Sequence, residues 1–346
     1  MGQNSKSLIK GMSLDELQNW CEKIGETRYR GIQLYGWLYK RRISNPQDMT
    51  DLSLRFRNYL TDHTELNTIF LDSKMSSNSE NTIKYLFTLA DGKQVETVSM
   101  VDGYRHTVCI SSQVGCSLEC DFCATAKMGL LRNLKTGEIV DQLLYVQNNV
   151  DEPVTNVVFM GMGEPFLNYD RVLKAADIFH DPRGLNMGAS RITISTVGLL
   201  PKIEQFINEK RKYKLAISLN AADDLTRNKI MPINKKWDIR EIIKAGKEFS
   251  KMKRRQIMFE YVLLKGINDS AEDAKKLSEL LVNVECKLNI IPYNETDGEY
   301  LRPDENTINE FINILHDRKK KNGYRVLVRW SKGQDIAAGC GQLAVN

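Results

Sequence analysis

Three cysteines lie within eight residues of one another, Cys116, Cys120 and Cys123, in the segment QVGCSLECDFCATA. Thiolate sulfurs are soft ligands that suit iron–sulfur clusters or zinc. A cubane cluster has four irons, this segment supplies three ligands, and a fourth cysteine at the usual ferredoxin spacing is missing. The spacing therefore predicts a [4Fe–4S] cluster with one iron free to bind a further ligand.

A structural zinc site is the alternative reading of the same cysteines. Such a site needs a fourth ligand, and neither a second CxxC motif nor a nearby histidine offers one. The histidines do not fall at ligand spacing with one another; they are His63, His106, His180 and His316. The cluster is therefore favoured over zinc.

A second motif follows one strand later, in the segment NVVFMGMGEPF that starts at Asn156. An apolar strand runs into a turn with Gly161 and Gly163 and then a carboxylate, Glu164. Glycines allow a ligand to approach the backbone closely, and a carboxylate accepts hydrogen bonds from an ammonium group. The turn alone is a weak signal, but its place directly after the cysteine segment predicts a ligand site shared with the cluster.

The CxxxCxxC and GMGEP motifs together resemble those of the radical S-adenosylmethionine (SAM) superfamily. Further segments resemble one branch, the RlmN-type adenine-C2 methyltransferases of 23S ribosomal RNA and tRNA. These segments are RITISTVGLLPKI, AISLNAADDLTRNKIMPINKKW, FEYVLLKGINDS, NIIPYN and QDIAAGCGQLA, and the N-terminal ETRYRGIQLYGWLYK resembles the accessory domain of that branch.

The resemblance implies a binding residue for each part of the cofactors. Cys116, Cys120 and Cys123 ligate the cluster, whose open iron binds SAM. The residues implied to contact SAM are Gly163 and Glu164 at its amino group, Ser195, the segment Ser218, Leu219 and Asn220, and Asn294 at the adenosine part. Asn220 stands where the family has histidine, and both side chains can form hydrogen bonds.

The resemblance also implies three catalytic residues. Cys340, in AGCGQLA, is the cysteine that carries the methyl group; Cys109 is its partner thiol; and Glu96 is an acid/base residue. From the residues alone, Cys109 is a strand core residue, Cys340 a spare thiol and Glu96 an exposed strand carboxylate. Cys21 and Cys286 are expected to be packing residues.

The implied reaction consumes two SAM molecules per turnover. The first methylates Cys340, and the second is split by the cluster to start radical chemistry that joins the methyl carbon to carbon 2 of adenine. Cys109 then releases the RNA by forming a disulfide with Cys340, which an external donor such as a flavodoxin or ferredoxin system reduces. The implied RNA partners are 23S rRNA at the peptidyl-transferase centre and tRNA next to the anticodon.

Other functions are kept open. A C8-methylating rRNA resistance enzyme shares the cluster and both cysteines; the sequence GEP rather than GEA and the helical N-terminal segment favour C2. A non-catalytic RNA-binding protein with a structural metal would have no need for Cys340. An electron carrier would have a fully ligated cluster and a far shorter chain.

The elements that must position these residues alternate between strands and helices from residue 107 onward. Predicted strands are 107–111, 156–160, 191–195, 214–219, 256–262, 287–291 and 325–329, and predicted helices between them include 136–146, 169–179, 239–251 and 270–281. This order predicts an α/β fold, a partial (β/α)6 radical-SAM barrel with its chemistry at the C-terminal strand ends.

The residues before 107 differ in pattern. A capping box at Ser13 and Glu16 opens a predicted helix, and further helices are expected over 30–41 and 52–60. Residues 73–81 (SKMSSNSEN) predict a loop, and 82–89 and 94–100 predict a hairpin around Asp91-Gly92. The expected domains are 1–72, a helical RNA-binding accessory domain; 73–106, a hairpin connector; and 107–346, the radical SAM core with the methyl-carrying cysteine loop.

Composition fits a globular enzyme, with 42% hydrophobic and 27% charged residues among 346. There is no signal-peptide-like start and no membrane-length apolar run, which predicts a cytoplasmic protein with reduced thiols, not bound to membranes. A monomer is expected. The net charge is +5, and residues 1–60 hold ten Lys or Arg against six Asp or Glu. With basic runs at 251–255 and 318–321, this is compatible with a phosphate-bearing partner.

Overall fold

The computed structural model describes residues 6–252 and 256–345, without the side chains of 319–322. Parts of the two basic runs, residues 253–255 and the side chains of 319–321, therefore lie outside the described residues. Within the described residues, none of the helices combines the length and the apolar character that crossing a bilayer requires.

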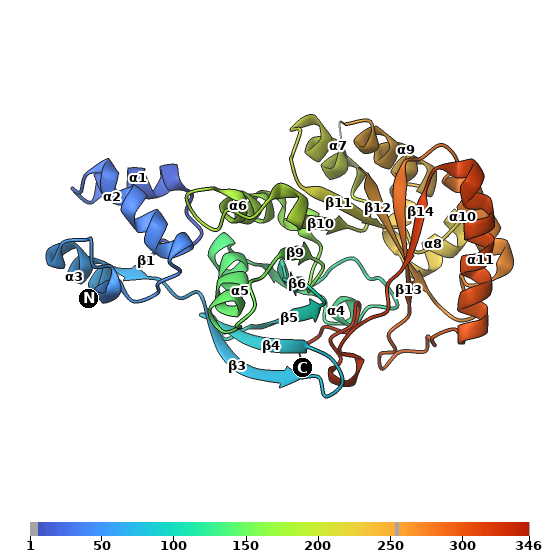
Figure 1. Ribbon diagram of the computed structural model, residues 1–346, viewed down its shortest axis with the longest axis horizontal. Helices are drawn as coiled ribbons and strands as arrows, with labels where there is room; N and C mark the ends of the chain where they lie inside the picture. Colours follow the sequence, from blue (N-terminus) through green and yellow to red (C-terminus); the bar gives the residue numbers. More distant parts are fainter. Residues whose placement is uncertain (1–5, 253–255, 346) are drawn as a thin grey trace.

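The N-terminal segment is helical, as the sequence predicts (Figure 1). Helix α1 (Leu14–Lys23) begins at a capping box in which Ser13 and Glu16 satisfy each other's backbone N–H groups, at 3.3 Å and 2.7 Å. Helix α2 (Arg28–Tyr35) continues through a wider π-helical turn, and α3 (Leu54–His63) follows. A short parallel pair, β1 (Ser7–Leu8) and β2 (Thr64–Glu65), ties the two ends of this segment together.

One ten-stranded sheet is the framework of the rest of the fold, in the order β14-β13-β12-β11-β10-β9-β6-β5-β4-β3. Its seven parallel strands are β6 (Arg105–Cys109), β9 (Asn156–Phe159), β10 (Ile192–Thr196), β11 (Lys214–Ser218), β12 (Ile257–Leu263), β13 (Cys286–Pro292) and β14 (Arg325–Val328). The predicted strand–helix alternation and the partial barrel are confirmed.

The connecting helices are α5 (Thr136–Asn148), α6 (Tyr169–His180), α7 (Leu200–Asn208), α8 (Asp224–Ile230), α9 (Ile239–Ser250), α10 (Ala271–Leu280) and α11 (Glu305–Asn322). Figure 1 shows α7, α9, α10 and α11 around the outside of the curved sheet. Side chains that point outward from the strands, such as Leu215, Phe259 and Leu288, are fully buried. The main core therefore lies between the sheet and its outer helices.

Three antiparallel strands continue the sheet beyond β6: β5 (Gln94–Asp102), β4 (Thr82–Leu89) and β3 (Ile69–Ser76). The predicted hairpin is confirmed, but the loop predicted over 73–81 is wrong for residues 73–76, which belong to β3. β3 is an edge strand with nearly every side chain exposed, so it lacks the apolar alternation by which a strand is recognised.

The chain after β14 crosses to these antiparallel strands (Figure 1). Lys332 Nζ lies 3.1 Å from Asp102 Oδ1, the Asn78 N–H donates to Asp335 Oδ2 at 2.9 Å, and Lys84 Nζ donates to the Ala337 carbonyl at 3.3 Å. We call residues 329–345 the C-terminal tail. The tail thus spans the side of the barrel between β14 and the β3–β5 end of the sheet.

Candidate active site

The three clustered cysteines lie in a loop that is closed at its base. Strands β7 (Gln113–Gly115) and β8 (Leu130–Asn133) pair at the two ends of the loop, and a short helix, α4 (Ala124–Lys127), lies within it. Gly115 has φ +75°, and a Cβ there would lie 1.8 Å from the Gly129 carbonyl oxygen. Only glycine fits where these two backbone segments meet, so closure of the loop requires glycine at position 115, directly before Cys116.

The three cysteine side chains lie close enough to one another to interact electrostatically. Cys120 is buried, while Cys116 and Cys123 are half-buried. Burial raises the pKa of Cys116 to about 11, and nearby Glu164 and Cys123 add to this effect. Burial, followed by the proximity of Cys123 and Cys116, raises the pKa of Cys120 well above its usual value. Thiols that influence one another in this way lie near one another, as ligands of one cluster must.

The residues present fit a cubane cluster. In the described part of the chain, no three His, Cys, Asp or Glu side chains are arranged around a single ion. The thiolates of a cubane bind separate irons, so they need a common space rather than a common point, and the loop offers one. Binding to iron removes the thiol protons and offsets the burial of three sulfurs.

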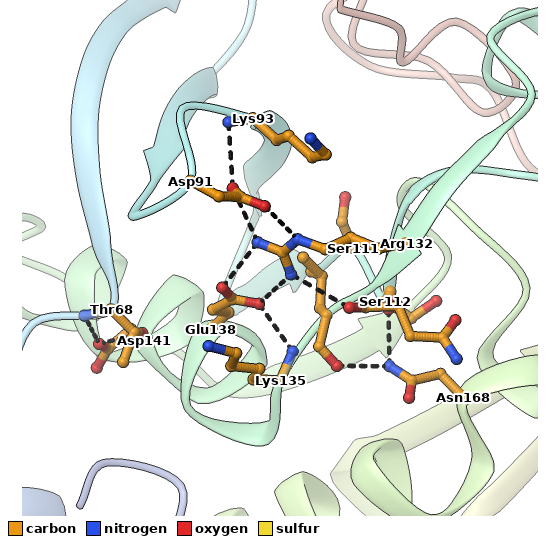
Figure 2. Close-up of polar contacts among 12 residues, drawn as sticks. Thr68, Asp91, Lys93, Ser111, Ser112, Arg132, Lys135, Glu138, Asp141 and Asn168 are labelled. Carbon is orange, nitrogen blue, oxygen red and sulfur yellow. Dashed lines mark hydrogen bonds and ion pairs between the residues drawn. The ribbon is translucent and has the colours of Figure 1, made fainter. Parts of the chain in front are cut away.

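Arg132 on β8 fastens the cysteine loop to two other elements (Figure 2). Its guanidinium lies 2.6 Å and 3.1 Å from the Asp91 carboxylate, in the β4–β5 turn, and 2.8 Å and 2.9 Å from the Glu138 carboxylate, in α5. The Arg132 guanidinium lowers the pKa of Asp91 to about 2. Asn168 adds two further bonds, donating to the Ser112 and Leu134 carbonyls at 2.9 Å and 2.8 Å.

The glycine-rich turn after β9 places Glu164 beside this loop. Gly163 has φ +94°, and a Cβ there would lie 2.4 Å from Gln113 Cβ. The Glu164 N–H donates to Gln113 Oε1 at 2.7 Å, and its carboxylate accepts the N–H groups of Val197 and Phe166 at 2.9 Å and 3.0 Å. Burial raises the pKa of Glu164 to about 7 although these N–H groups oppose it. A buried carboxylate of this kind gains from a cationic ligand.

The other predicted SAM contacts follow neighbouring strands at their C-terminal ends. Ser195 is on β10, Ser218 ends β11, and Asn294 comes just after β13. Asn294 Nδ2 donates to the Cys340 carbonyl at 3.1 Å, whereas its Oδ1 is buried and has no hydrogen-bond partner within the described residues. An orphaned buried acceptor is compatible with a missing ligand donor.

Leu219 and Asn220 are less available to a ligand than the resemblance implies. The Leu219 side chain is fully buried. Asn220 has φ +54°, accepts the Val262 N–H at 2.9 Å and donates to Met231 Sδ at 3.3 Å. Asn220 therefore links β11 to β12 through its side chain, which is a structural use for the residue that replaces the family histidine.

Cys340 lies in the part of the tail that covers the cysteine loop. The Ala124 N–H donates to the Gly341 carbonyl at 2.8 Å, and Thr125 Oγ1 donates to the Leu343 carbonyl at 2.5 Å. Cys340 as a residue is exposed, but protein atoms surround its sulfur and raise its pKa to about 12, with smaller contributions from Cys123 and Cys109. The tail thus brings Cys340 near both the cluster loop and Cys109.

Cys109 ends β6 and is buried, and burial raises its pKa to about 12. Both Cys109 and Cys340 are free thiols, so the disulfide implied by the resemblance is not formed in this conformation. Cys21 and Cys286 are also free, fully buried and packed in the core, as expected.

Glu96 is buried on β5, not exposed as its position in the strand alone suggested. Its Oε1 lies 2.9 Å from Lys84 Nζ, and its Oε2 accepts the Ala344 N–H at 3.0 Å. Burial raises the pKa of Glu96, while Lys84 and the Ala344 N–H act against the rise. The carboxylate therefore touches the same tail that carries Cys340.

Sequence reasoning missed Arg227 in α8, which is fully buried. Its guanidinium donates to the carbonyls of Val197, Leu219 and Ser218 at 2.6, 2.9 and 3.1 Å, and to Asn234 Oδ1 at 2.8 Å. Burial lowers the pKa of Arg227 to about 10, opposed by nearby Cys120 and Asp224. Arg227 therefore holds the chain at the ends of β10 and β11 beneath the cysteine loop, and no spacing pattern marks it in the sequence.

A second polar cluster that the sequence does not predict links β12, β13 and the tail. Glu260 and Asn289 are partners in the strand register, and Asn289 Nδ2 donates to Glu260 Oε1 at 2.8 Å. Arg329 Nε donates to Asn289 Oδ1 at 3.3 Å. Burial raises the pKa of Glu260 to about 7, and Arg329 opposes the rise. Ser218 pairs with Glu260 in register, so this polar group lies on the same inner face as a predicted SAM contact.

Two family models match the chain. Residues 110–278 match the Radical SAM superfamily, and residues 8–66 match the ribosomal RNA large subunit methyltransferase N-terminal domain. The first range contains the cysteine loop and the glycine-rich turn, and the second contains α1, α2 and α3.

Curated relatives match nearly the whole chain. A protein of Geobacter sulfurreducens named dual-specificity RNA methyltransferase RlmN is 43% identical over 336 residues, covering 97% of this chain and 91% of the relative. A protein of the same name from Bdellovibrio bacteriovorus is 41% identical, covering 99% and 84%. A crystal structure of a radical SAM methyltransferase from Sphaerobacter thermophilus is 40% identical, with a TM-score of 0.92 over 97% of this chain and 98% of that one.

Proposed function

Because this chain belongs to the family of RlmN dual-specificity RNA methyltransferases within the radical SAM superfamily, we propose that it methylates carbon 2 of adenosine in 23S rRNA and in tRNA. The rRNA target is in the peptidyl-transferase centre, and the tRNA target is next to the anticodon. The observation that carries the proposal is the position of Cys340, whose tail covers the cysteine loop and reaches both Asn294 and Glu96.

We assign the parts of the chain as follows. Residues 1–72 form the helical accessory domain that contacts RNA, residues 73–106 the hairpin connector, and residues 107–346 the catalytic core. The hairpin strands continue the core sheet. This continuity supports a fixed position, rather than a hinged one, for Glu96 relative to the site.

Cys116, Cys120 and Cys123 would hold a [4Fe–4S] cluster, which together with SAM would supply the radical chemistry that activates the methyl group. Glu164 fits the SAM ammonium group, because its buried carboxylate lies beside the cysteine loop. Asn294 fits the adenosine part through its unpartnered Oδ1. Gly163, Ser195 and Ser218 line the neighbouring strand ends, while Leu219 and Asn220 contribute through backbone atoms or through their hold on β12.

The thiols and Glu96 do the protein's part of the transfer. Cys340 accepts the methyl group of a first SAM molecule, losing its thiol proton, and then presents the methyl carbon to adenine. Glu96 accepts the proton that leaves carbon 2, and its raised pKa suits a group that must take up a proton. Cys109 attacks the Cys340 sulfur to free the RNA, and the resulting disulfide requires two electrons from an external donor, for which we propose a flavodoxin or ferredoxin system.

We propose that the enzyme acts as a monomer in the cytoplasm, where thiols stay reduced. The C8-methylating rRNA resistance enzyme is the second candidate, since it would use the same cysteines. A non-catalytic RNA-binding protein with a structural metal is disfavoured by the tail, because that role gives Cys340 no reason to lie beside Cys109 and the cysteine loop.

The test uses anaerobically reconstituted full-length protein and rRNA or tRNA from a strain that lacks the endogenous enzyme. Mass spectrometry of the digested RNA should find 2-methyladenosine; finding only 8-methyladenosine would replace the proposal with the second candidate. Cys340→Ala should abolish methylation while iron stays bound, and Cys109→Ala should accumulate protein covalently linked to RNA. The matched control, Cys286→Ala, removes a buried thiol of no proposed role and should keep activity.

A further inference from the structure

The inner face of the barrel is open to solvent at the N-terminal ends of its strands. Successive side chains of a strand point to opposite faces. On β11, Leu215 and Ile217 are fully buried, whereas Lys214 is only half-buried. The same alternation leaves Met258 on β12 and Lys287 on β13 half-buried between fully buried neighbours. Since the outer face is covered by helices, these half-buried side chains line the inner face.

Five cations gather at this end of the sheet. Parallel strands start at one edge, and the register places Lys214 opposite Thr193, Lys287 opposite Met258, and Arg325 opposite Lys287. We call this group the basic mouth: Arg105 at the start of β6, Arg191 just before β10, Lys214 at the start of β11, Lys287 near the start of β13 and Arg325 at the start of β14.

The charges of the basic mouth are not compensated by carboxylates. In the part of the chain that the structure describes, none of the five forms an ion pair with Asp or Glu. Arg191 instead donates to Asn156 Oδ1 at 3.3 Å. Asp102, which faces Arg105 in the β5–β6 register, is bonded to Lys332 at 3.1 Å. Burial lowers the pKa of Lys214, and the neighbouring Lys287, Arg105 and Arg191 lower it further.

An exposed aromatic side chain accompanies the cations. Tyr104 is 88% exposed, in the turn between β5 and β6, next in sequence to Arg105. Proteins bind single-stranded RNA with cations placed along the RNA backbone and with exposed aromatic rings. The RNA phosphates contact the cations, and the bases stack on the rings.

We propose that the basic mouth and Tyr104 form the opening through which the RNA strand reaches the inner face of the barrel. Its phosphates bind Arg105, Arg191, Lys214, Lys287 and Arg325, and a base beside the target stacks on Tyr104. This proposal rests on the proposed function and identifies which surface receives its substrate.

The basic mouth and the proposed reaction site lie at opposite ends of the same strand, β6. Arg105 and Cys109 are the two ends of β6, four residues apart and therefore about 13 Å along the strand. An adenosine turned out of its RNA loop can extend along this inner face toward Cys109 and Cys340 while its phosphates remain on the mouth.

The test compares two triple variants of the full-length protein. The mouth variant is Arg191→Gln, Lys214→Gln and Lys287→Gln. The control variant is Lys244→Gln, Lys247→Gln and Lys275→Gln, three exposed lysines on the outer helices α9 and α10. Fluorescence anisotropy with a synthetic RNA stem-loop that carries unpaired adenosines gives the binding constant over a range of salt concentrations.

Each lost phosphate contact should reduce the slope of log K against log salt by about 0.7 for single-stranded RNA, so the mouth variant should lose about two units of slope and bind at least about tenfold more weakly. The control variant should match the wild type. Lys214→Arg should keep the wild-type slope, which separates loss of charge from damage to the strand. Tyr104→Ala should weaken binding while Tyr104→Phe retains it.

Equal binding and equal slopes for the mouth variant and the wild type would overturn the proposal, as would an equal loss in the control variant. RNA methylation by the wild type, measured in parallel, tests the proposed function separately. Wild-type methylation with unaltered binding by the mouth variant means that only the assigned surface is wrong. A wild type that binds RNA through the mouth but never methylates it contradicts the proposed function and leaves the surface supported.

Discussion

Lys84 and Glu96 form an ion pair of 2.9 Å on one face of the β4–β5 hairpin. Leu86 lies directly opposite Glu96 in the register, so the pair is diagonal, at the reach of a long lysine side chain. Both side chains are largely buried, at 12% and 7% exposed, so solvent screens the pair little. Lys84 also donates to the Ala337 carbonyl, which makes the pair part of the attachment of the tail.

Lys84→Met should raise the pKa of Glu96, because Lys84 opposes the effect of burial on that carboxyl. In the proposed mechanism Glu96 acts as a base in its ionised form, so the acid limb of the pH–rate profile should move to higher pH, and methylation at neutral pH should fall by about tenfold or more. Single-turnover methylation rates between pH 6 and pH 9 measure this. Lys74→Met, which removes an exposed lysine from β3, is the control; identical profiles for both variants would rule out the coupling.

Gly163→Ala should disrupt the turn that carries Glu164. The added Cβ would lie 2.4 Å from Gln113 Cβ and 2.8 Å from the Gln113 nitrogen, and φ is +94°. We expect a loss of about 2–3 kcal/mol of stability and much weaker binding of SAM, measured by urea unfolding and by calorimetry. Gly36→Ala is the matched control, because Gly36 has φ −62° in a helix and nothing within 4 Å of an added Cβ. Gly36→Ala should be neutral or slightly stabilising.

Arg132→Met should destabilise the cysteine loop more than the loss of an ordinary surface ion pair. It leaves the Glu138 carboxylate, 4% exposed, without its charged partner, at a cost of about 2–3 kcal/mol. Arg28→Met, which breaks the Arg28–Glu22 pair whose side chains are 48% and 53% exposed, should cost about 1 kcal/mol or less. Comparable unfolding midpoints for the two variants would show that the Arg132 network contributes little.

The Arg132–Asp91 pair should also appear in the pH dependence of stability. The folded pKa of Asp91 is about 2, below its ordinary 3.8, so the stabilisation is complete above pH 3.8 and is lost as the pH falls toward 2. Asp91 is 40% exposed, so the effect is small. The difference in unfolding free energy between the wild type and Asp91→Asn should be constant from pH 7 to pH 5 and shrink below pH 4. A difference that grows on acidification would contradict this.

Arg227→Lys should be strongly destabilising although it keeps the charge. Lysine cannot reach the four acceptors that the guanidinium satisfies, and buried carbonyls at the ends of β10 and β11 would lose their donors. We expect a loss of about 3–5 kcal/mol and less iron bound after reconstitution, measured by urea unfolding and by iron analysis. Arg240→Gln, an exposed arginine on α9, should leave both measurements unchanged.

The sequence predicts the periodic parts of the fold well and the irregular parts poorly. The parallel strands are apolar runs between amphipathic helices, and the hairpin has Asp91-Gly92 at its turn, so local pattern and structure agree. β3 was missed because an exposed edge strand carries no alternation. The last turn of the second predicted helix widens into a π-helical turn, which no residue type in GWLYK signals.

The residues of the candidate site are likewise predictable only in part. The cysteines and the glycine-rich turn are contiguous motifs, so their spacing identifies them. Arg227, Arg132 and Glu260 bond to partners in other elements at no regular sequence spacing, and the burial of Glu96 depends on the tail that crosses it. Those relationships exist only once the sheet has formed, so single-sequence patterns do not contain them. Asn220 differs from these residues: it lies in a recognisable motif, but its side chain bonds to the Val262 N–H and so has a structural role.

The tail completes the barrel wall with scattered hydrogen bonds and ion pairs rather than with a strand ladder. A segment fastened in this way can detach locally while every strand of the sheet stays paired. Detachment would move Cys340 away from the cysteine loop and uncover the side of the barrel between β14 and β5. Because Cys340 lies on this segment, the same movement would expose its sulfur to an external reductant without opening the sheet.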